Sequence, residues 1–82
     1  MASRLTIVHR RECDLCDEMV AEVRALGRTL TLPPLEIVDV DGEPELLRRY
    51  GLNVPVLLLD GTLVCKHRLD AAELRRLLRA GP

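Results

Sequence analysis

Two cysteines separated by two residues, Cys13 and Cys16, are the side chains of this sequence best suited to chemistry. A cysteine thiolate attacks disulfides, and a second thiol one helical turn away resolves the mixed disulfide that forms. An apolar run, residues 5–8, precedes the pair, and an apolar-periodic run, residues 15–26, follows it. This order predicts a strand, a short loop and a helix with Cys13 at its N-terminus, where the helix dipole favours a thiolate. We therefore expect Cys13 to be the exposed, attacking thiol and Cys16 the shielded, resolving one.

Composition narrows the class of protein. The chain has 82 residues, of which 48% are hydrophobic, and this predicts one domain over residues 1–82. Its 12 basic and 13 acidic residues give no electrostatic basis for binding nucleic acid. No apolar run approaches the ~20 residues of a membrane span, and residues 1–8 are too short and polar for a secretory signal. Three cysteines exclude a fully paired disulfide framework within one chain, which favours a reducing compartment. We expect a soluble cytoplasmic protein, and we expect it to be a monomer.

The first half of the chain predicts a strand, a helix and a second strand. Residues 5–9 form a short, β-rich apolar segment. Residues 35–40 predict a less buried strand, which the crossover helix makes parallel to the first. The helix between them is expected to end at Gly27. Its apolar positions recur at helical spacing and are Leu15, Met19, Val20, Val23 and Leu26.

Two further helices are predicted in the second half. Pro44 suits the first turn of a short helix that Gly51 ends. Asp70 and Glu73 have the spacing of a capping box before a final helix. The residues expected to face inward are Leu46, Leu47 and Tyr50 in the short helix and Leu74, Leu77 and Leu78 in the last one.

A hairpin is predicted between these two helices. Residues 56–59 are consecutive apolar residues, which predict a central strand covered on both faces. An Asp-Gly turn follows, and residues 62–67 predict the returning strand at the edge of the sheet. Alternation places Leu63 and Cys65 on one face of that strand and Val64 on the other. The element order is therefore β-α-β-α-β-β-α, which is an α/β fold.

This order and two motifs together resemble the thioredoxin superfamily, and specifically the small glutaredoxin-like proteins. The motifs are the cysteine pair at the first strand–helix junction and Val54-Pro55 before the third strand. The resemblance covers essentially the whole chain and implies a thioredoxin-like, four-stranded mixed sheet flanked by helices. It also implies a cis peptide bond at Pro55 beside the dithiol, with the backbone of Val54 free to pair with an extended substrate segment.

The resemblance also implies a function and residues that bind substrate. Glutaredoxin-like proteins are thiol–disulfide oxidoreductases, so the implied reaction is the reduction of protein disulfides or glutathione mixed disulfides. Arg10, with Arg11 beside it, matches the basic residue that helps to hold the carboxylate of glutathione. Asn53 stands where glutaredoxins usually carry Thr before Val-Pro. No bound cofactor is implied, and glutathione is a candidate co-substrate.

Two segments differ from the usual glutaredoxin pattern. Asp14 and Leu15 separate the cysteines, whereas glutaredoxins typically carry Pro-Tyr there. Residues 65–68 read Cys-Lys-His-Arg where glutaredoxins typically have a Gly-Gly pair that lets glutathione approach the backbone. The chain therefore resembles a divergent branch of the family.

Two alternatives to redox chemistry remain. Cys65 and His67 could join the cysteine pair in a zinc site of three thiolates and one imidazole. In the predicted topology the two pairs lie at the same end of the sheet but one strand apart, so roughly 10 Å separates them. Because that is too far for shared coordination, we favour redox chemistry and expect no metal site. A redox-inactive module that binds partner proteins is the other alternative.

Overall fold

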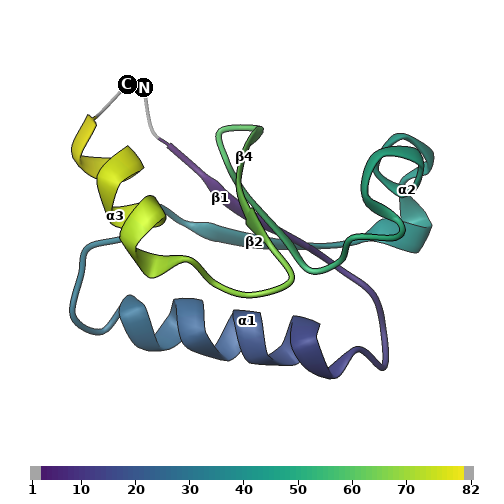
Figure 1. Ribbon diagram of the computed structural model, residues 1–82, viewed down its shortest axis with the longest axis horizontal. Coiled ribbons are helices and arrows are strands. Elements are labelled where there is room, and N and C mark those ends of the chain that lie inside the picture. The colour runs from purple at the N-terminus through teal and green to yellow at the C-terminus, as the bar shows by residue number, and fades with distance from the viewer. Residues whose placement is uncertain (1–2, 81–82) are drawn as a thin grey trace.

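The computed structural model describes residues 3–80. Its strands are β1 (Leu5–His9), β2 (Leu35–Asp39), β3 (Val56–Leu59) and β4 (Thr62–Lys66). Its helices are α1 (Asp14–Leu26), α2 (Pro44–Tyr50) and α3 (Ala71–Ala80), and a 3₁₀ turn, η1 (Val40–Gly42), precedes α2 (Figure 1). This order confirms the predicted β-α-β-α-β-β-α pattern. None of the helices within residues 3–80 is long and apolar enough to span a membrane.

The four strands form one mixed sheet in the order β2-β1-β3-β4. β1 runs parallel to β2 and antiparallel to β3, and β3 pairs with β4 as a hairpin. Within the pair β1–β3, Val8 lies opposite Val56. The C-terminal end of β1 and the N-terminal end of β3 therefore meet at the same end of the sheet.

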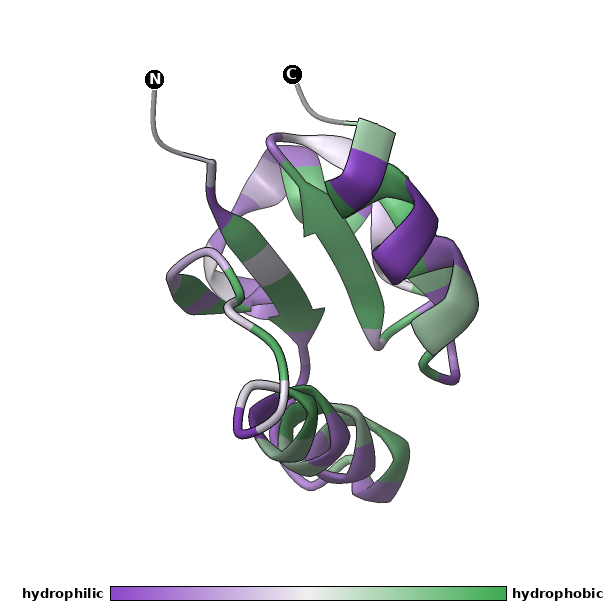
Figure 2. Cartoon of the chain, turned by 90° about the vertical axis from the view of Figure 1, so that its left-hand side faces the viewer, coloured by the Kyte–Doolittle hydropathy of each residue, from purple (hydrophilic) through white to green (hydrophobic). Residues whose placement is uncertain are grey.

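Both faces of the two central strands are buried, because successive side chains of a strand point to opposite faces. Ile7 and Leu57 belong to a larger hydrophobic cluster that α1 and α3 cover. Val8 and Val56 belong to a smaller cluster on the other face, which η1 and α2 cover. Figure 2 shows the hydrophobic residues along the strands and the mixture of hydrophilic and hydrophobic residues along the helices. This arrangement confirms the central position predicted for β3.

Two leucines expected to face inward are instead exposed. Leu15 is 38% exposed because the buried stripe of α1 runs through Cys16, Met19 and Val23. Around the helix Leu15 lies about 100° from Cys16 and about 80° from Val23, so it falls at the edge of that stripe, in the first turn. Leu47 is 42% exposed for the same reason, since the short helix α2 contacts the core through Leu46 and Tyr50, which lie one turn apart.

The faces predicted for β4 were also wrong. Leu63 pairs with Leu58, but the next pair along the hairpin joins Cys65 to Leu57, so β4 contains one extra residue. Because of this bulge, Val64 and Cys65 both pack against the larger cluster, and Leu63 is 46% exposed. β2 and β4 each end one residue earlier than predicted.

Candidate active site

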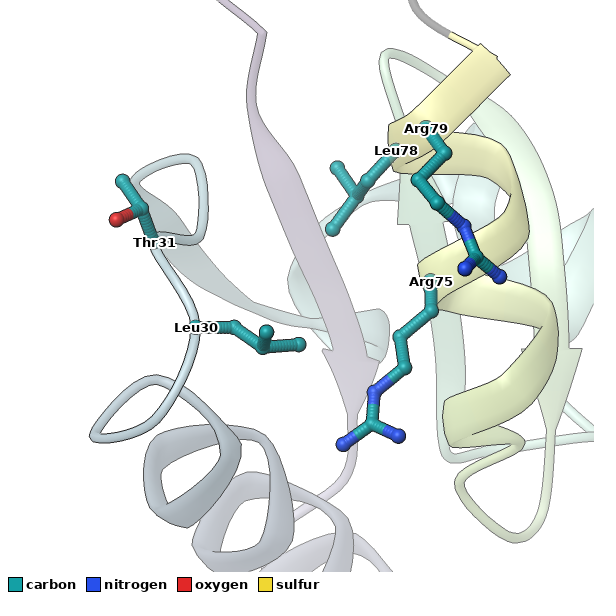
Figure 3. A pocket seen from close by; sticks show the side chains of 5 residues that line it. All are labelled: Leu30, Thr31, Arg75, Leu78 and Arg79. Carbon is teal, nitrogen blue, oxygen red and sulfur yellow. The ribbon is translucent and has the colours of Figure 1, made fainter.

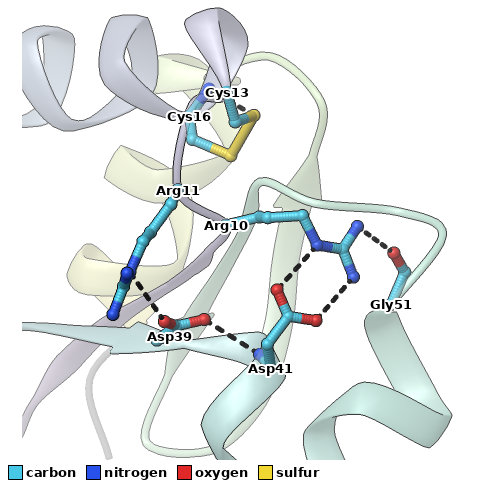
Figure 4. Close-up of polar contacts among 7 residues, drawn as sticks. All are labelled: Arg10, Arg11, Cys13, Cys16, Asp39, Asp41 and Gly51. Atoms are coloured by element: carbon cyan, nitrogen blue, oxygen red, sulfur yellow. Dashed lines mark hydrogen bonds and ion pairs between the residues drawn. A yellow bond between two sulfur atoms is a disulfide. The ribbon is translucent and has the colours of Figure 1, made fainter.

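Cys13 and Cys16 form a disulfide at the N-terminus of α1, with their Cα atoms 5.2 Å apart (Figure 4). Cys13 is the N-cap residue, and its Sγ accepts a hydrogen bond of 3.2 Å from the backbone N–H of Cys16. Cys13 is half-buried and Cys16 is fully buried. These exposures fit the predicted roles of attacking and resolving thiol, and the roles themselves stay predictions.

The backbone conformation before Cys13 accounts for the turn from β1 into α1. Glu12 has a left-handed backbone conformation, with φ at 55°, which ends the extension of β1 and redirects the chain. The first helical hydrogen bond then runs from the N–H of Asp17 to the carbonyl oxygen of Cys13, at 3.0 Å. Helix N-terminal N–H groups stabilise a thiolate, so the N–H of Cys16 is placed to do so once the disulfide is reduced.

The peptide bond between Val54 and Pro55 is cis. Pro55 is buried, and its carbonyl oxygen accepts a hydrogen bond of 2.7 Å from the N–H of His67. Asn53 and Val54 are half-buried, and the N–H of Asn53 donates to the carbonyl oxygen of Tyr50 at 2.8 Å. Within residues 3–80, no hydrogen bond engages the backbone of Val54. The segment lies at the sheet end where β1 leads to the disulfide.

Arg10 lies between these two segments and is already bonded within the chain. Its Nε and Nη2 donate to the two carboxylate oxygens of Asp41 at 3.0 and 3.1 Å, and its Nη1 donates to the carbonyl oxygen of Gly51 at 2.9 Å (Figure 4). The hydrogen bond with Asp41 raises the pKa of Arg10, and the same bond lowers the pKa of Asp41. The predicted role of Arg10 in holding glutathione stays untested, and three of its donors are occupied here.

Arg11 is far more accessible than Arg10. Its side chain is 88% exposed, and its Nε lies 3.9 Å from a carboxylate oxygen of Asp39, a long and weak ion pair. The other carboxylate oxygen of Asp39 accepts a hydrogen bond of 2.9 Å from the N–H of Asp41. Asp39 therefore orients the residue that binds Arg10.

Sequence reasoning missed Asp39, Asp41 and Gly51 as parts of this site. A signal for the two carboxylates was present, because β1 and β2 were predicted to be parallel. Residues that follow neighbouring parallel strands come together at one edge of the sheet, which brings Arg10 near Asp41. The contact with Gly51 had no comparable signal, because it is made by a backbone carbonyl.

Cys65 and His67, the candidates for a zinc site, form no metal-binding cluster with Cys13 and Cys16. Cys65 is half-buried, and its Sγ accepts a hydrogen bond of 3.4 Å from the N–H of Asp70. Burial raises the pKa of the Cys65 thiol, which keeps it protonated and weakly nucleophilic at neutral pH. No group of three or more metal-binding side chains is present in the described part of the chain, residues 3–80.

A surface pocket of about 240 Å³ lies away from the disulfide. It lies between the connection that follows α1 and the side of α3 that faces this connection, and Arg75 points across it (Figure 3). Its lining consists of Leu30, Thr31, Arg75, Leu78 and Arg79. The pocket contains none of the residues predicted to bind substrate.

Comparison with known proteins identifies a family. Residues 4–79 match the family described as Glutaredoxin-like domain (DUF836). No curated protein matches the sequence. Among solved structures, the chain resembles protein Ne2328 from Nitrosomonas europaea, with 30% sequence identity, coverage of 94% of this chain and 92% of that one, and a TM-score of 0.83.

Two further solved structures are similar. Protein XcR50 from X. campestris is 35% identical in its solution structure, with 100% of this chain and 97% of that chain covered and a TM-score of 0.65. Reduced desulfothioredoxin from Desulfovibrio vulgaris Hildenborough is 22% identical, with 98% and 82% covered and a TM-score of 0.69. The last likeness shows the fold alone, which is that of thioredoxin.

Proposed function

The chain belongs to the glutaredoxin-like domain family, and from this premise we propose that it is a thiol–disulfide oxidoreductase whose redox dithiol is Cys13 and Cys16. The main support is the disulfide at the N-terminus of α1, in which Cys13 is half-buried and Cys16 is fully buried. Both the family match and the cysteine pair support a redox-type function. The particular reaction and substrates are our proposal.

The proposed reaction begins with the reduced protein. The thiolate of Cys13 attacks one sulfur of a substrate disulfide, forms a mixed disulfide with it and releases the other substrate sulfur, which takes up a proton. The thiol of Cys16 then loses its proton and attacks the Sγ of Cys13. This step forms the Cys13–Cys16 disulfide and releases the second substrate thiol. The protein has then lost two electrons and two protons, which a thiol reductant such as glutathione must restore.

Two segments supply the proposed substrate contacts. The unbonded backbone of Val54 would pair with an extended substrate segment, with Asn53 and Pro55 beside it. Arg11, in the loop before Cys13, offers an exposed cation. We propose that the partner is either a protein that contains a disulfide or glutathione itself, and that no nucleic acid or membrane takes part. We also propose that the protein acts in the cytoplasm as a monomer and without a bound cofactor.

Two exposed leucines favour a protein as the substrate. Leu15 lies between the cysteines, and Leu52, in the segment that precedes the cis peptide bond, is 98% exposed. Apolar side chains at the edge of a reactive site contact a protein surface more readily than a small polar tripeptide.

A turnover assay tests the proposal. The reduced protein is supplied with a peptide mixed disulfide and a thiol reductant, and the released thiol is measured. We expect Cys13→Ser to abolish turnover, because it removes the attacking sulfur, and Cys65→Ser to leave turnover unchanged. Cys16→Ser should accumulate the mixed disulfide on Cys13. Turnover that survives Cys13→Ser would exclude the proposed mechanism.

A further inference from the structure

The guanidinium of Arg10 joins three segments that are distant in the sequence. Arg10 begins the dithiol loop, residues 10–13, which leads into Cys13. Gly51 begins the proline loop, residues 51–55, which contains the cis peptide bond. Asp41 lies in η1 and accepts both hydrogen bonds of a bidentate pair. We call Arg10, Asp41 and the carbonyl group of Gly51 the clasp.

Both acceptors of the clasp are held on well-fixed backbone. The N–H of Asp41 is bonded to the carboxylate of Asp39, and the N–H of Gly51 donates to the carbonyl oxygen of Leu47 at 2.9 Å. Gly51 is buried, and a Cβ atom added to it would lie 2.5 Å from that oxygen. The backbone therefore approaches α2 too closely for any other residue, which fixes where the carbonyl of Gly51 points.

The clasp also occupies Arg10 as a cation. A planar guanidinium has five N–H donors in a fixed fork, and two of the three used here match the two oxygens of one carboxylate. A substrate carboxylate would have to displace Asp41 or approach its negative charge. The exposed Arg11, with its weak pair, has no such competitor of comparable geometry.

We infer that Arg10 is a positioning residue, which fixes the dithiol loop relative to the proline loop, and that it does not hold a substrate carboxylate. This inference rests on the proposed oxidoreductase function. Attack on a disulfide requires the sulfur of Cys13 to lie in line with the two substrate sulfurs, and in the proposed complex the substrate backbone is held by pairing with Val54. Since these two contacts come from different loops, their separation must be constant, and misplacement by about 1 Å costs as much as 10²-fold in rate.

Paired substrates separate the two roles. One substrate is a peptide mixed disulfide with glutathione, and the other is the same compound with the glycine carboxylate of glutathione converted to an amide. The variants are Arg10→Gln, Arg10→Lys, Asp41→Asn and the combination of Arg10→Gln with Asp41→Asn. Arg75→Gln, exposed on α3 at the distant pocket, is the control for the loss of one positive charge. All assays are run at a temperature well below the thermal unfolding midpoint of each variant.

We expect Arg10→Gln and Asp41→Asn each to lower kcat/KM by roughly tenfold, equally for both substrates. The double variant should be no worse than the worse single one, because both changes open the same clasp. Arg10→Lys should not restore the rate, because an ammonium cannot make the bidentate pair. The inference is overturned if Arg10→Gln affects only the carboxylate substrate and Asp41→Asn improves it, since a freed Arg10 would then bind the carboxylate.

Hydrogen exchange tests the clasp without any turnover. The amide of Asn53, in the proline loop, donates to the carbonyl oxygen of Tyr50 at the end of α2, so opening of that loop should accelerate its exchange. We expect faster exchange in Arg10→Gln and Asp41→Asn and no change in Arg75→Gln. Unchanged exchange in all three would contradict the clasp. If wild type reduces neither substrate but exchange responds as expected, the proposed function fails while the clasp stands.

Discussion

The reactivity of Cys13 depends on a few atoms around its sulfur. The N–H of Cys16 already points at that sulfur, and the helix dipole adds to its effect, so the local backbone favours the thiolate. Arg10 contributes less charge than the sequence suggested, because Asp41 lies against it. The sequence was sufficient to predict that the cysteine pair lies at the N-terminus of α1 and that Cys16 is the more buried of the two. The pair of Arg10 with Asp41 could have been inferred from the parallel strands, but the bond to Gly51 could not, because a hydrogen bond to a backbone carbonyl leaves no mark on residue types.

The clasp should make stability depend on pH through Asp41. Its hydrogen bond with Arg10 lowers the pKa of Asp41 below the unfolded value of ~3.9. The contribution is therefore fully present above that value and is lost as the pH falls through the folded pKa. We expect Asp41→Asn to lower the free energy of unfolding at pH 7, and the difference from wild type to shrink below about pH 4.

Urea unfolding at a series of pH values measures this dependence. Glu18→Gln, on the exposed side of α1, is the control for the loss of one negative charge and should show no comparable dependence. A difference between Asp41→Asn and wild type that stays constant down to the lowest pH would argue against the ion pair.

At the scale of elements, turn residues mark most boundaries. Gly27 follows α1, Pro44 begins α2, and the turn of Asp60 and Gly61 joins β3 to β4, as predicted. Sequence periodicity did not predict which way some side chains point within an element. The exposure of Leu15 follows from one step of about 100° around a helix, and a bulge without a glycine changes the faces of β4.

The close approach between α2 and the proline loop gives a prediction at this scale. We expect Gly51→Ala to lower the free energy of unfolding by about 1–3 kcal/mol, because the added methyl group would overlap the backbone of Leu47. Gly42→Ala is the matched control, because no atom lies within 4 Å of the added group. It should change stability by less than about 0.5 kcal/mol. Equal effects of the two substitutions in chemical denaturation would disprove this steric explanation.

At the scale of the whole molecule, the topology brings the chemistry together. The parallel pair β1–β2 places the dithiol loop beside η1, and the antiparallel pair β1–β3 places it at the same end as the proline loop. Figure 1 shows α2 and the connection from β1 to α1 at one side of the molecule and α3 at the other. Element order and the two motifs were enough to predict this architecture, since few topologies accommodate a crossover helix followed by a hairpin. Contacts between loops depend on side-chain geometry, which pattern alone does not specify.

The most direct test of the redox dithiol is a peptide map of the protein after reduction and then mild oxidation. Cleavage after arginine and lysine gives one peptide, residues 12–24, with both Cys13 and Cys16, and another, residues 50–66, with Cys65. We expect the first peptide to lose the mass of two hydrogens reversibly and the second to stay unchanged. A disulfide that links the two peptides, or a first peptide that stays reduced after the mild oxidation, would contradict the central claim.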